Sequence, residues 1–341
     1  MWRYAFLALS LGVVVLVGCG RGGEVPLAPN SVGDGPIRSQ RDLDAFGSAH
    51  DGPFVIEDDL SIIAPLLDNV EELRDLVRVE GNFIIKNNFC LKSLAGLQNL
   101  AFVGGDLHII ANGLVSLEGL EKLESVGGDL EISCNFSLRD LDALTRLRSV
   151  GGHLFIDATT DLVRIDGLSQ LAHVGGSIKI RDNKSLRNLK GLDALTKVEG
   201  DLLLIFNSAL QNLRGLNGLT SIKGQLIIDG HSVLGSLEGL DKLTMVAGDL
   251  RINANAALPN LNGLSDLSQV GKSLYIGNNA VLENLDGLLH LQGIGEGERD
   301  LMIVELNPVL PEYTAYALAE RLGLTEHRYI VFNNRVEPNL D

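Results

Sequence analysis

The sequence predicts a mainly β fold, a right-handed β-solenoid of leucine-rich turns of about 24 residues with a short helical cap at each end. The first observation behind this prediction is a self-similarity at that period, in nearly unbroken register from Val79 to Gly293. The second is the composition, which is 45% hydrophobic but only 5% aromatic. The core must therefore be built from layers of Leu, Ile and Val, as in repeat proteins.

The N-terminus gives the clearest indication of where the protein is located in the cell. Trp2 to Tyr4 form a short basic region, and Ala5 to Val17 is an apolar stretch of signal-peptide length, too short for a membrane-spanning helix. It ends in Leu16-Val17-Gly18-Cys19, which resembles a bacterial lipobox. The resemblance implies that residues 1–18 are a lipoprotein signal peptide and that acyl chains are attached to Cys19. The alternative is an ordinary leader, or an anchor helix, with an incidental cysteine.

Two segments precede the repeats. Residues 19–36 are rich in Gly and Pro and lack hydrophobic periodicity, which predicts a flexible tether. Residues 37–78 are expected to hold the N-terminal cap and the first turn. Ser39 to Asp42 fits a helical capping box, and Gly47 is expected to end the helix. A strand from Phe54 to Ile56 should follow.

Residues 79–293 are the predicted repeats, and Val126 to Leu147 is one clear unit. Its opening Val-Gly-Gly is interpreted as a corner, where the missing Cβ permits positive φ and close approach of stacked backbones. Alternating apolar and polar residues then predict a strand with one buried face. Leucines at every third position predict a tight returning coil around a narrow apolar interior. About ten such turns, one inter-strand distance of about 4.8 Å apart, give a body roughly 50 Å long.

An asparagine recurs where each strand ends. A stacked column of amides satisfies backbone groups that a corner leaves unpaired, so we interpret these residues as structural rather than ligand-binding. The column is broken at Thr159 and His231. Its members are Asn88, Asn112, Asn135, Asn183, Asn207, Asn255 and Asn279.

Residues 294–341 are expected to form the last turn and the C-terminal cap. Pro311 fits the first position of a helix, and Gly323 fits the residue just after its end. A last strand from Tyr329 to Phe332 should close the stack beside Asn333. The apolar stripe of the predicted helix consists of Ala315, Leu318 and Leu322.

The repeat resembles a known family. The combination Val-x-Gly-Asp-Leu-x-Ile-x-x-Asn-x-x-Leu-x-x-Leu-x-Gly-Leu-x-x-Leu, best seen from Val198 to Thr220, resembles the receptor L-domain family, relatives of the leucine-rich repeats. The resemblance implies a closed coil and a binding role shared with receptor ectodomains and bacterial surface lipoproteins. It implies no particular ligand, because the disulfide-rich modules that follow receptor lobes are absent from this sequence.

Charge and motifs weigh against several classes of function. The chain has 44 Asp and Glu against 28 Lys and Arg, a net charge of −16, which repels phosphate backbones and makes nucleic acid a poor partner. The string from Gly230 to Gly235 misses a nucleophile elbow, and the seven histidines lack zinc-site spacing. Asp106 and Asp129 stack as carboxylates suited to Ca²⁺, but their column continues too irregularly, which favours solvated surface acids. We therefore expect no enzyme, no metal and no cofactor.

One column is the candidate binding face. It is the outward position between the two buried aliphatic residues of each strand, and it mixes aromatic, aliphatic and cationic side chains, which interface cores favour. Starting after Ile84, it reads His108, Glu131, Phe155, Lys179, Leu203, Ile227, Arg251 and Tyr275.

These observations predict an exported, lipid-anchored binding or adhesion module in the bacterial envelope, at the outer membrane or cell surface. Its partners would be the membrane, through acyl chains on Cys19, and an unknown protein or glycan. The alternatives are a passive spacer and a self-associating envelope protein. Cys90 and Cys134 fall two turns apart, too far for a bridge, so both are expected to be free thiols.

Overall fold

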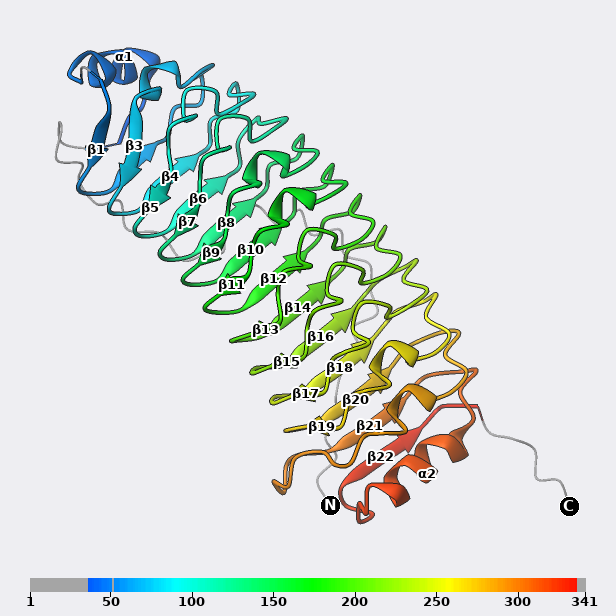
Figure 1. Ribbon diagram of the computed structural model, residues 1–341. Coiled ribbons are helices and arrows are strands. Elements are labelled where there is room, and N and C mark those ends of the chain that lie inside the picture. Colours follow the sequence, from blue (N-terminus) through cyan, green and yellow to red (C-terminus); the bar gives the residue numbers. More distant parts are fainter. Residues whose placement is uncertain (1–35, 51, 336–341) are drawn as a thin grey trace, which may run out of the picture.

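The computed structural model describes residues 36–50 and 52–335. The predicted signal peptide, Cys19 and almost all of the predicted tether therefore lie outside the described residues. The described chain winds into one elongated parallel β-solenoid (Figure 1). This confirms the predicted fold class, a mainly β, leucine-rich-repeat-like solenoid with few helices.

One long sheet runs the length of the molecule. Twelve parallel strands, rather than the expected ten or so, follow one another because the caps also contribute strands. In stacking order they are β2 (Leu60–Ile62), β4 (Phe83–Lys86), β6 (Leu107–Ile110), β8 (Leu130–Ser133), β10 (Leu154–Asp157), β12 (Ile178–Arg181), β14 (Leu202–Ile205), β16 (Leu226–Asp229), β18 (Leu250–Asn253), β20 (Leu274–Gly277), β21 (Met302–Glu305) and β22 (Tyr329–Phe332).

Two shorter parallel sheets lie just before the Gly-rich corner of each turn. Only β1 was predicted from the sequence, as the strand from Phe54 to Ile56; most of the others contain two residues, too few to show alternation. One contains β1 (Phe54–Ile56), β3 (Leu76–Val79), β5 (Phe102–Val103), β7 (Ser125–Val126), β9 (Ser149–Val150) and β11 (His173–Val174). The other contains β13 (Lys197–Val198), β15 (Ser221–Ile222), β17 (Met245–Val246) and β19 (Gln269–Val270).

The leucine-rich segments return the chain behind the long sheet, as predicted. Leu138, Leu141, Leu144 and Leu147 are each fully buried, as are their counterparts in nearly every turn. A three-residue spacing suits a 3₁₀ turn, in which residues i and i+3 lie on the same side. Five such turns form: η1 (Glu71–Leu73), η2 (Asp142–Leu144), η3 (Asp166–Leu168), η4 (Asn262–Leu264) and η5 (Asp286–Leu288).

The Gly-rich corners hold stacked backbones together. A Cβ on Gly127 would lie 2.0 Å from the carbonyl oxygen of Gly104, and one on Gly151 would lie 2.0 Å from that of Gly127. Close approach is therefore the requirement here, as predicted. Positive φ is not required at these corners and occurs instead at glycines of the returning coil, such as Gly119 and Gly191.

The N-terminal cap is α1 (Gln40–Ser48). Ser39 accepts a hydrogen bond from the Asp42 N–H at 3.2 Å, which confirms the predicted helix start. The prediction that Gly47 ends the helix is wrong, since the helix continues to Ser48. Gly47 is needed for packing, because a Cβ there would lie 2.6 Å from the Cβ of Glu72 in η1.

The C-terminal cap is α2 (Glu312–Arg321), which occupies the row of returning 3₁₀ turns in Figure 1. Pro311 lies one position earlier than predicted, at the extended residue before the helix, where its lack of an N–H is equally harmless. Gly323 has the left-handed conformation expected just beyond a helix end, with φ of 65°. The chain then forms β22 over the predicted residues. None of the described helices is long and apolar enough to cross a membrane.

Candidate functional site

A buried polar column lies where the strands of the long sheet end. Asn183 shows the pattern: its Oδ1 accepts a hydrogen bond from the Thr159 N–H at 3.0 Å, and its Nδ2 donates to the Ile156 carbonyl at 2.8 Å. Each asparagine side chain thus satisfies a donor and an acceptor of the turn before it. We call this the buried column: Asn88, Asn112, Asn135, Thr159, Asn183, Asn207, His231, Asn255, Asn279, Asn307 and Asn334.

The buried column includes every asparagine predicted for it and two more, Asn307 and Asn334. The last strand is therefore followed by a column residue at Asn334, one position beyond the predicted Asn333. Insertions in the last two turns hid these members, because Asn307 comes 28 residues after Asn279 and Asn334 comes 27 after Asn307.

His231 keeps the hydrogen-bond pattern, although the sequence suggested a break. Its Nδ1 accepts from the Asn207 N–H at 3.2 Å, and its Nε2 donates to the Leu204 carbonyl at 3.1 Å. In a neutral imidazole, Nδ1 therefore replaces the carboxamide oxygen as acceptor and Nε2 replaces the carboxamide nitrogen as donor. Burial lowers the pKa of His231, only partly opposed by its backbone hydrogen bonds.

Thr159 does break the pattern. Its hydroxyl bonds to the Asp157 carbonyl of its own turn at 3.3 Å. Within the described part of the chain, no hydrogen bond joins Thr159 to the Asn135 N–H of the turn before.

A second ladder precedes each strand and corrects the interpretation of Asp106 and Asp129 as merely solvated acids. Asp106 Oδ1 accepts from the Asp129 N–H at 2.7 Å, and Asp129 Oδ1 accepts from the His153 N–H at 2.7 Å. His153 Nδ1 and Ser177 Oγ continue the ladder in the next two turns. The residue types vary because any side chain with a hydrogen-bond acceptor can fill this position. No group of three or more ligand-type side chains in the described regions is placed to hold a metal ion.

The structure places the whole candidate binding face in one row. Directly paired positions of neighbouring strands align His108 with Glu131, Phe155 with Lys179, and Arg251 with Tyr275. We call this row the outward column, and it is longer than the predicted set. Its members are Ser61, Ile84, His108, Glu131, Phe155, Lys179, Leu203, Ile227, Arg251, Tyr275, Ile303 and Ile330.

The outward column is less exposed than a free surface would be. His108 is buried, and the positions from Glu131 to Tyr275 are half-buried. The reason is a neighbouring outward row, two residues further along each strand, which contains Asp157, Arg181 and Ile205. Side chains of the two rows cover one another.

At the N-terminal end the outward column is ionic. His108 Nδ1 lies 3.1 Å from Glu131 Oε2, and Ser133 donates to the other oxygen of Glu131 at 2.7 Å. Burial lowers the pKa of His108, but the hydrogen bond and charge of Glu131, with the charge of Asp106, more than reverse this and raise it. Burial acts to raise the pKa of Glu131, and the bond to His108 lowers it overall. The contact therefore favours the charged forms of both side chains.

Further along, charged side chains are again satisfied within the protein. Asp157 binds Arg181 at 2.7 Å and Lys179 at 3.4 Å. Near the C-terminal end, Arg251 binds Asp229 at 3.1 Å and lies 4.4 Å from the ring centroid of Tyr275.

Two of the predicted aromatic anchors are also engaged. Phe155 stacks on His153 with ring centroids 5.4 Å apart. The Tyr275 hydroxyl donates to Glu305 at 2.7 Å. Burial, together with that bond, raises the pKa of Tyr275, so it remains a donor. Neither ring is free for a partner without giving up an internal contact.

An apolar patch lies between these ionic regions. Leu203 and Ile227 are paired neighbours in the outward column, Ile205 lies in the second row, and the Phe206 ring is 52% exposed. We call these four residues the central patch. The ring of Phe206 extends over Gly230 of the next turn, where an added Cβ would lie 2.1 Å from it.

The sequence pattern indicated only half of the central patch, Leu203 and Ile227. Ile205 and Phe206 were missed because they follow the second buried aliphatic residue, where the strand was expected to be turning into its corner. The available signal was the apolar run from Leu202 to Phe206, since most other turns have a polar residue among the two that follow the second buried aliphatic residue. Phe206 has φ of 55°, as do the equivalent residues of most other turns.

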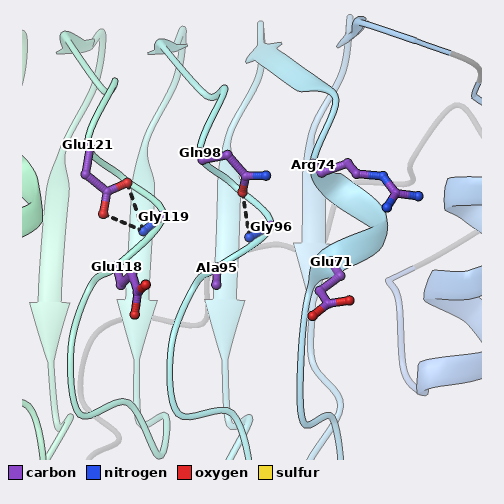
Figure 2. A pocket seen from close by; sticks show the side chains of 8 residues that line it. All are labelled: Glu71, Arg74, Ala95, Gly96, Gln98, Glu118, Gly119 and Glu121. Atoms are coloured by element: carbon purple, nitrogen blue, oxygen red, sulfur yellow. Dashed lines mark hydrogen bonds between the residues drawn. The ribbon is translucent and has the colours of Figure 1, made fainter.

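A hollow on the opposite, returning side of the solenoid is a weaker candidate (Figure 2). Gln98 and Glu121 line it, but their side chains accept hydrogen bonds from the Gly96 and Gly119 N–H groups at 2.8 and 2.9 Å. The same bond recurs at Asp193 in a later turn. These side chains therefore serve the turn conformation.

The two cysteines of the repeat differ. Cys90 is an exposed free thiol, as predicted. Cys134 is assigned to a disulfide, so the prediction of a free thiol there is wrong. Its partner is not Cys90, which lies two turns away and is a free thiol.

No protein-family model and no curated protein matches the chain. Among solved structures it is similar to an internalin from Listeria monocytogenes str. 4b F2365, at 16% sequence identity and a TM-score of 0.32. The similarity covers 79% of this chain and 84% of that one. Nothing about fold or function follows from a similarity this low. The fold is established by the strand register described above.

Proposed function

We propose that this protein is an exported, lipid-anchored binding module that presents the long sheet to a protein or glycan partner. The central patch is the observation that carries the proposal. It is a stretch of the outward column where neighbouring side chains are apolar and where charged residues lie on both sides, in the turn before and in the turn after. An apolar centre with a polar rim is the arrangement of an interface hot spot.

The remaining column residues form the rim. Lys179 and Arg181 lie one turn before the central patch, and Asp229 and Arg251 lie at its other side. Their charges are paired across turns, so they add little net affinity but exclude partners of the wrong shape and charge. The proposal assigns no catalytic step to the molecule.

Site-specific photo-crosslinking on intact cells tests the site. A photoreactive residue replacing Leu203 or Ile227 should give an adduct with the partner. A matched control replaces Leu289, which is 61% exposed on the returning side. Adducts at Leu289 and none at the long sheet would place the binding surface elsewhere.

The anchor is tested separately. Mass spectrometry of the mature protein should find an N-terminal Cys19 that carries acyl chains, since several chains on one residue give stable anchoring. A thioether on Cys19 also excludes that sulfur from any disulfide, so the same peptide map should contain no disulfide-linked peptide that includes Cys19. A mature N-terminus beyond residue 19, or a disulfide through Cys19, contradicts lipid anchoring.

Protease shaving of intact cells distinguishes the two sides of the envelope. Release of fragments supports a partner outside the cell, and protection supports one within the envelope. The second candidate function is a passive or self-associating envelope protein. It predicts that no crosslink to another protein or glycan forms at the central patch.

A further inference from the structure

The two ends of the long sheet are closed differently. At the N-terminal end, Ile37 runs beside β2: its N–H donates to the Ser61 carbonyl at 2.9 Å, and its own carbonyl accepts from the Ile63 N–H at 2.8 Å. All three residues of β2 are buried. In the described part of the chain, this end therefore has no exposed strand edge for another chain to pair with.

At the C-terminal end, β22 is the last strand and pairs only with β21 among the described strands (Figure 1). The Arg328 and Phe332 carbonyls accept bonds from β21. Since backbone groups alternate along a strand, the N–H and C=O groups of Tyr329 and Val331 point away from it. No hydrogen bond to these groups is present within residues 36–50 and 52–335.

The side chains at this edge are also unusual for a free edge. Natural edge strands are guarded by charges, prolines or bulges. In contrast, β22 reads Tyr-Ile-Val-Phe, and Ile330 and Phe332 are 44% and 41% exposed. The adjoining α2 adds Tyr313, which is 62% exposed, and Tyr316, whose ring meets that of Tyr329 edge-on at 6.1 Å.

We propose that β22 pairs with β22 of a second copy of this chain, antiparallel and about a twofold axis. Head-to-tail addition has no complementary edge, because the N-terminal end is closed. A twofold interface needs only the one edge that is open. The pairing extends the existing sheet and covers the apolar side chains of the strand and of α2.

The hydrogen-bonding pattern selects the register. The groups that point outward belong to Tyr329 and Val331, so all of them are satisfied when Tyr329 faces Val331 of the second copy. Ile330 then faces Ile330 of the second copy at the axis, with Cα atoms about 4.5 Å apart in a non-hydrogen-bonded pair. Both α2 helices lie on the same side of the joined sheet, where Tyr313 and Tyr316 approach the dyad.

The test uses the full-length protein solubilised in detergent, with its mass followed by analytical ultracentrifugation over a range of concentrations. The wild type should be a dimer. Ile330→Asp puts two carboxylates face to face and should raise the dimer dissociation constant at least about tenfold. The matched control is Val55→Asp, since Val55 is 40% exposed on a strand at the other end, and it should leave the dimer unchanged.

A mixing experiment identifies the register. Ile330→Lys alone should also dissociate, whereas an equimolar mixture of Ile330→Asp and Ile330→Lys chains should recover the dimer, because opposite charges then meet at the axis. A monomeric wild type, a dimer unaffected by Ile330→Asp, or a mixture that stays monomeric overturns the proposal. So does a wild type that becomes dimeric only when residues 336–341 are deleted, since the chain would then cover its own edge.

Discussion

The buried column and the outward column run through the same turns, only a few residues apart, and differ in how freely their residue types vary. All but two members of the buried column are asparagine, and His231 reproduces the same donor and acceptor. Twelve positions of the outward column contain acids, bases, aromatic and aliphatic residues. At every buried corner the backbone needs one side-chain acceptor and one side-chain donor, whereas at the outward position it needs neither. Backbone hydrogen bonding therefore does not fix the residue types of the outward column.

The largest effect should come from removing an amide of the buried column. Asn207→Ala deprives the Asn183 N–H and the Ile180 carbonyl of their partners, at 3.0 and 2.8 Å, in a fully buried site. Two unsatisfied groups and a cavity should cost about 3 kcal/mol or more. Urea unfolding measures this change. Lys184→Ala, on an exposed side chain just beyond the column, is the control and should change stability little.

His231 should make the buried column sensitive to acid. Its folded-state pKa lies below the ordinary value of 6.5, because burial disfavours the charged form. Stability is therefore intact above pH 6.5 and falls as the pH drops toward the folded-state pKa, by about 1.4 kcal/mol per pH unit from this residue. Unfolding midpoints at about pH 7.5 and pH 5.5 measure the loss.

The matched variant is His231→Asn, which restores the carboxamide found in the neighbouring turns. It should stay folded and lose this part of the acid sensitivity. An unchanged pH profile would mean that His231 is not held neutral in the folded state.

A smaller gain should follow from repairing the break in the column. Thr159→Asn adds a side-chain acceptor for the Asn135 N–H and a side-chain donor for the Ile132 carbonyl. Asn183 makes the two equivalent hydrogen bonds one turn later. The expected stabilisation is about 1 kcal/mol. Thermal unfolding compares it with Thr159→Val, which adds no hydrogen bond and should not stabilise.

On the outward column the pH effect should be smaller and opposite in sign. The folded-state pKa of His108 is raised, so the stability it contributes is present below the ordinary value of 6.5 and is lost as the pH rises through the folded-state pKa. His108→Gln should remove a contribution of less than about 1 kcal/mol near pH 6. Near pH 8.5 the variant and the wild type should have nearly equal unfolding free energies. A larger loss at alkaline pH would contradict the ion pair.

The sequence predicted those parts of the fold that repeat. Each turn has the same packing and hydrogen-bonding requirements. These requirements explain the period, the buried aliphatic residues of the strands and the asparagine column. Single events were predicted less well. Gly47 was expected to end α1, but its role depends on Glu72, which is distant in sequence. Asn307 and Asn334 were missed because insertions shift the period.

The candidate site was predicted as a row but not as a surface. The strand pattern gave the order of the outward column correctly. It could not show that Phe155 stacks on His153 or that Tyr275 binds Glu305, because these contacts depend on rotamers and on neighbouring turns. It also missed Phe206, which lies where the strand was expected to turn into its corner but has an exposed ring.

The smallest effect on stability should come from the central patch, where the effect on binding should be greatest. Leu203→Ser with Ile227→Ser removes two half-buried side chains that make no hydrogen bond, so the unfolding free energy should fall by about 1 kcal/mol or less. If the patch is the centre of an interface, a photoreactive residue in place of Phe206 should crosslink the partner in the otherwise wild-type protein. The adduct should be lost when Leu203→Ser and Ile227→Ser are also present. Phe155→Ala with Tyr275→Ala is the comparison, since both rings are engaged within the protein and should matter more to stability than to binding.

Retained adduct formation in a folded Leu203→Ser, Ile227→Ser protein would show that the central patch does not bind the partner. An unfolded double variant would show that these side chains belong to the core, and that the outward column is under the same constraint as the buried one.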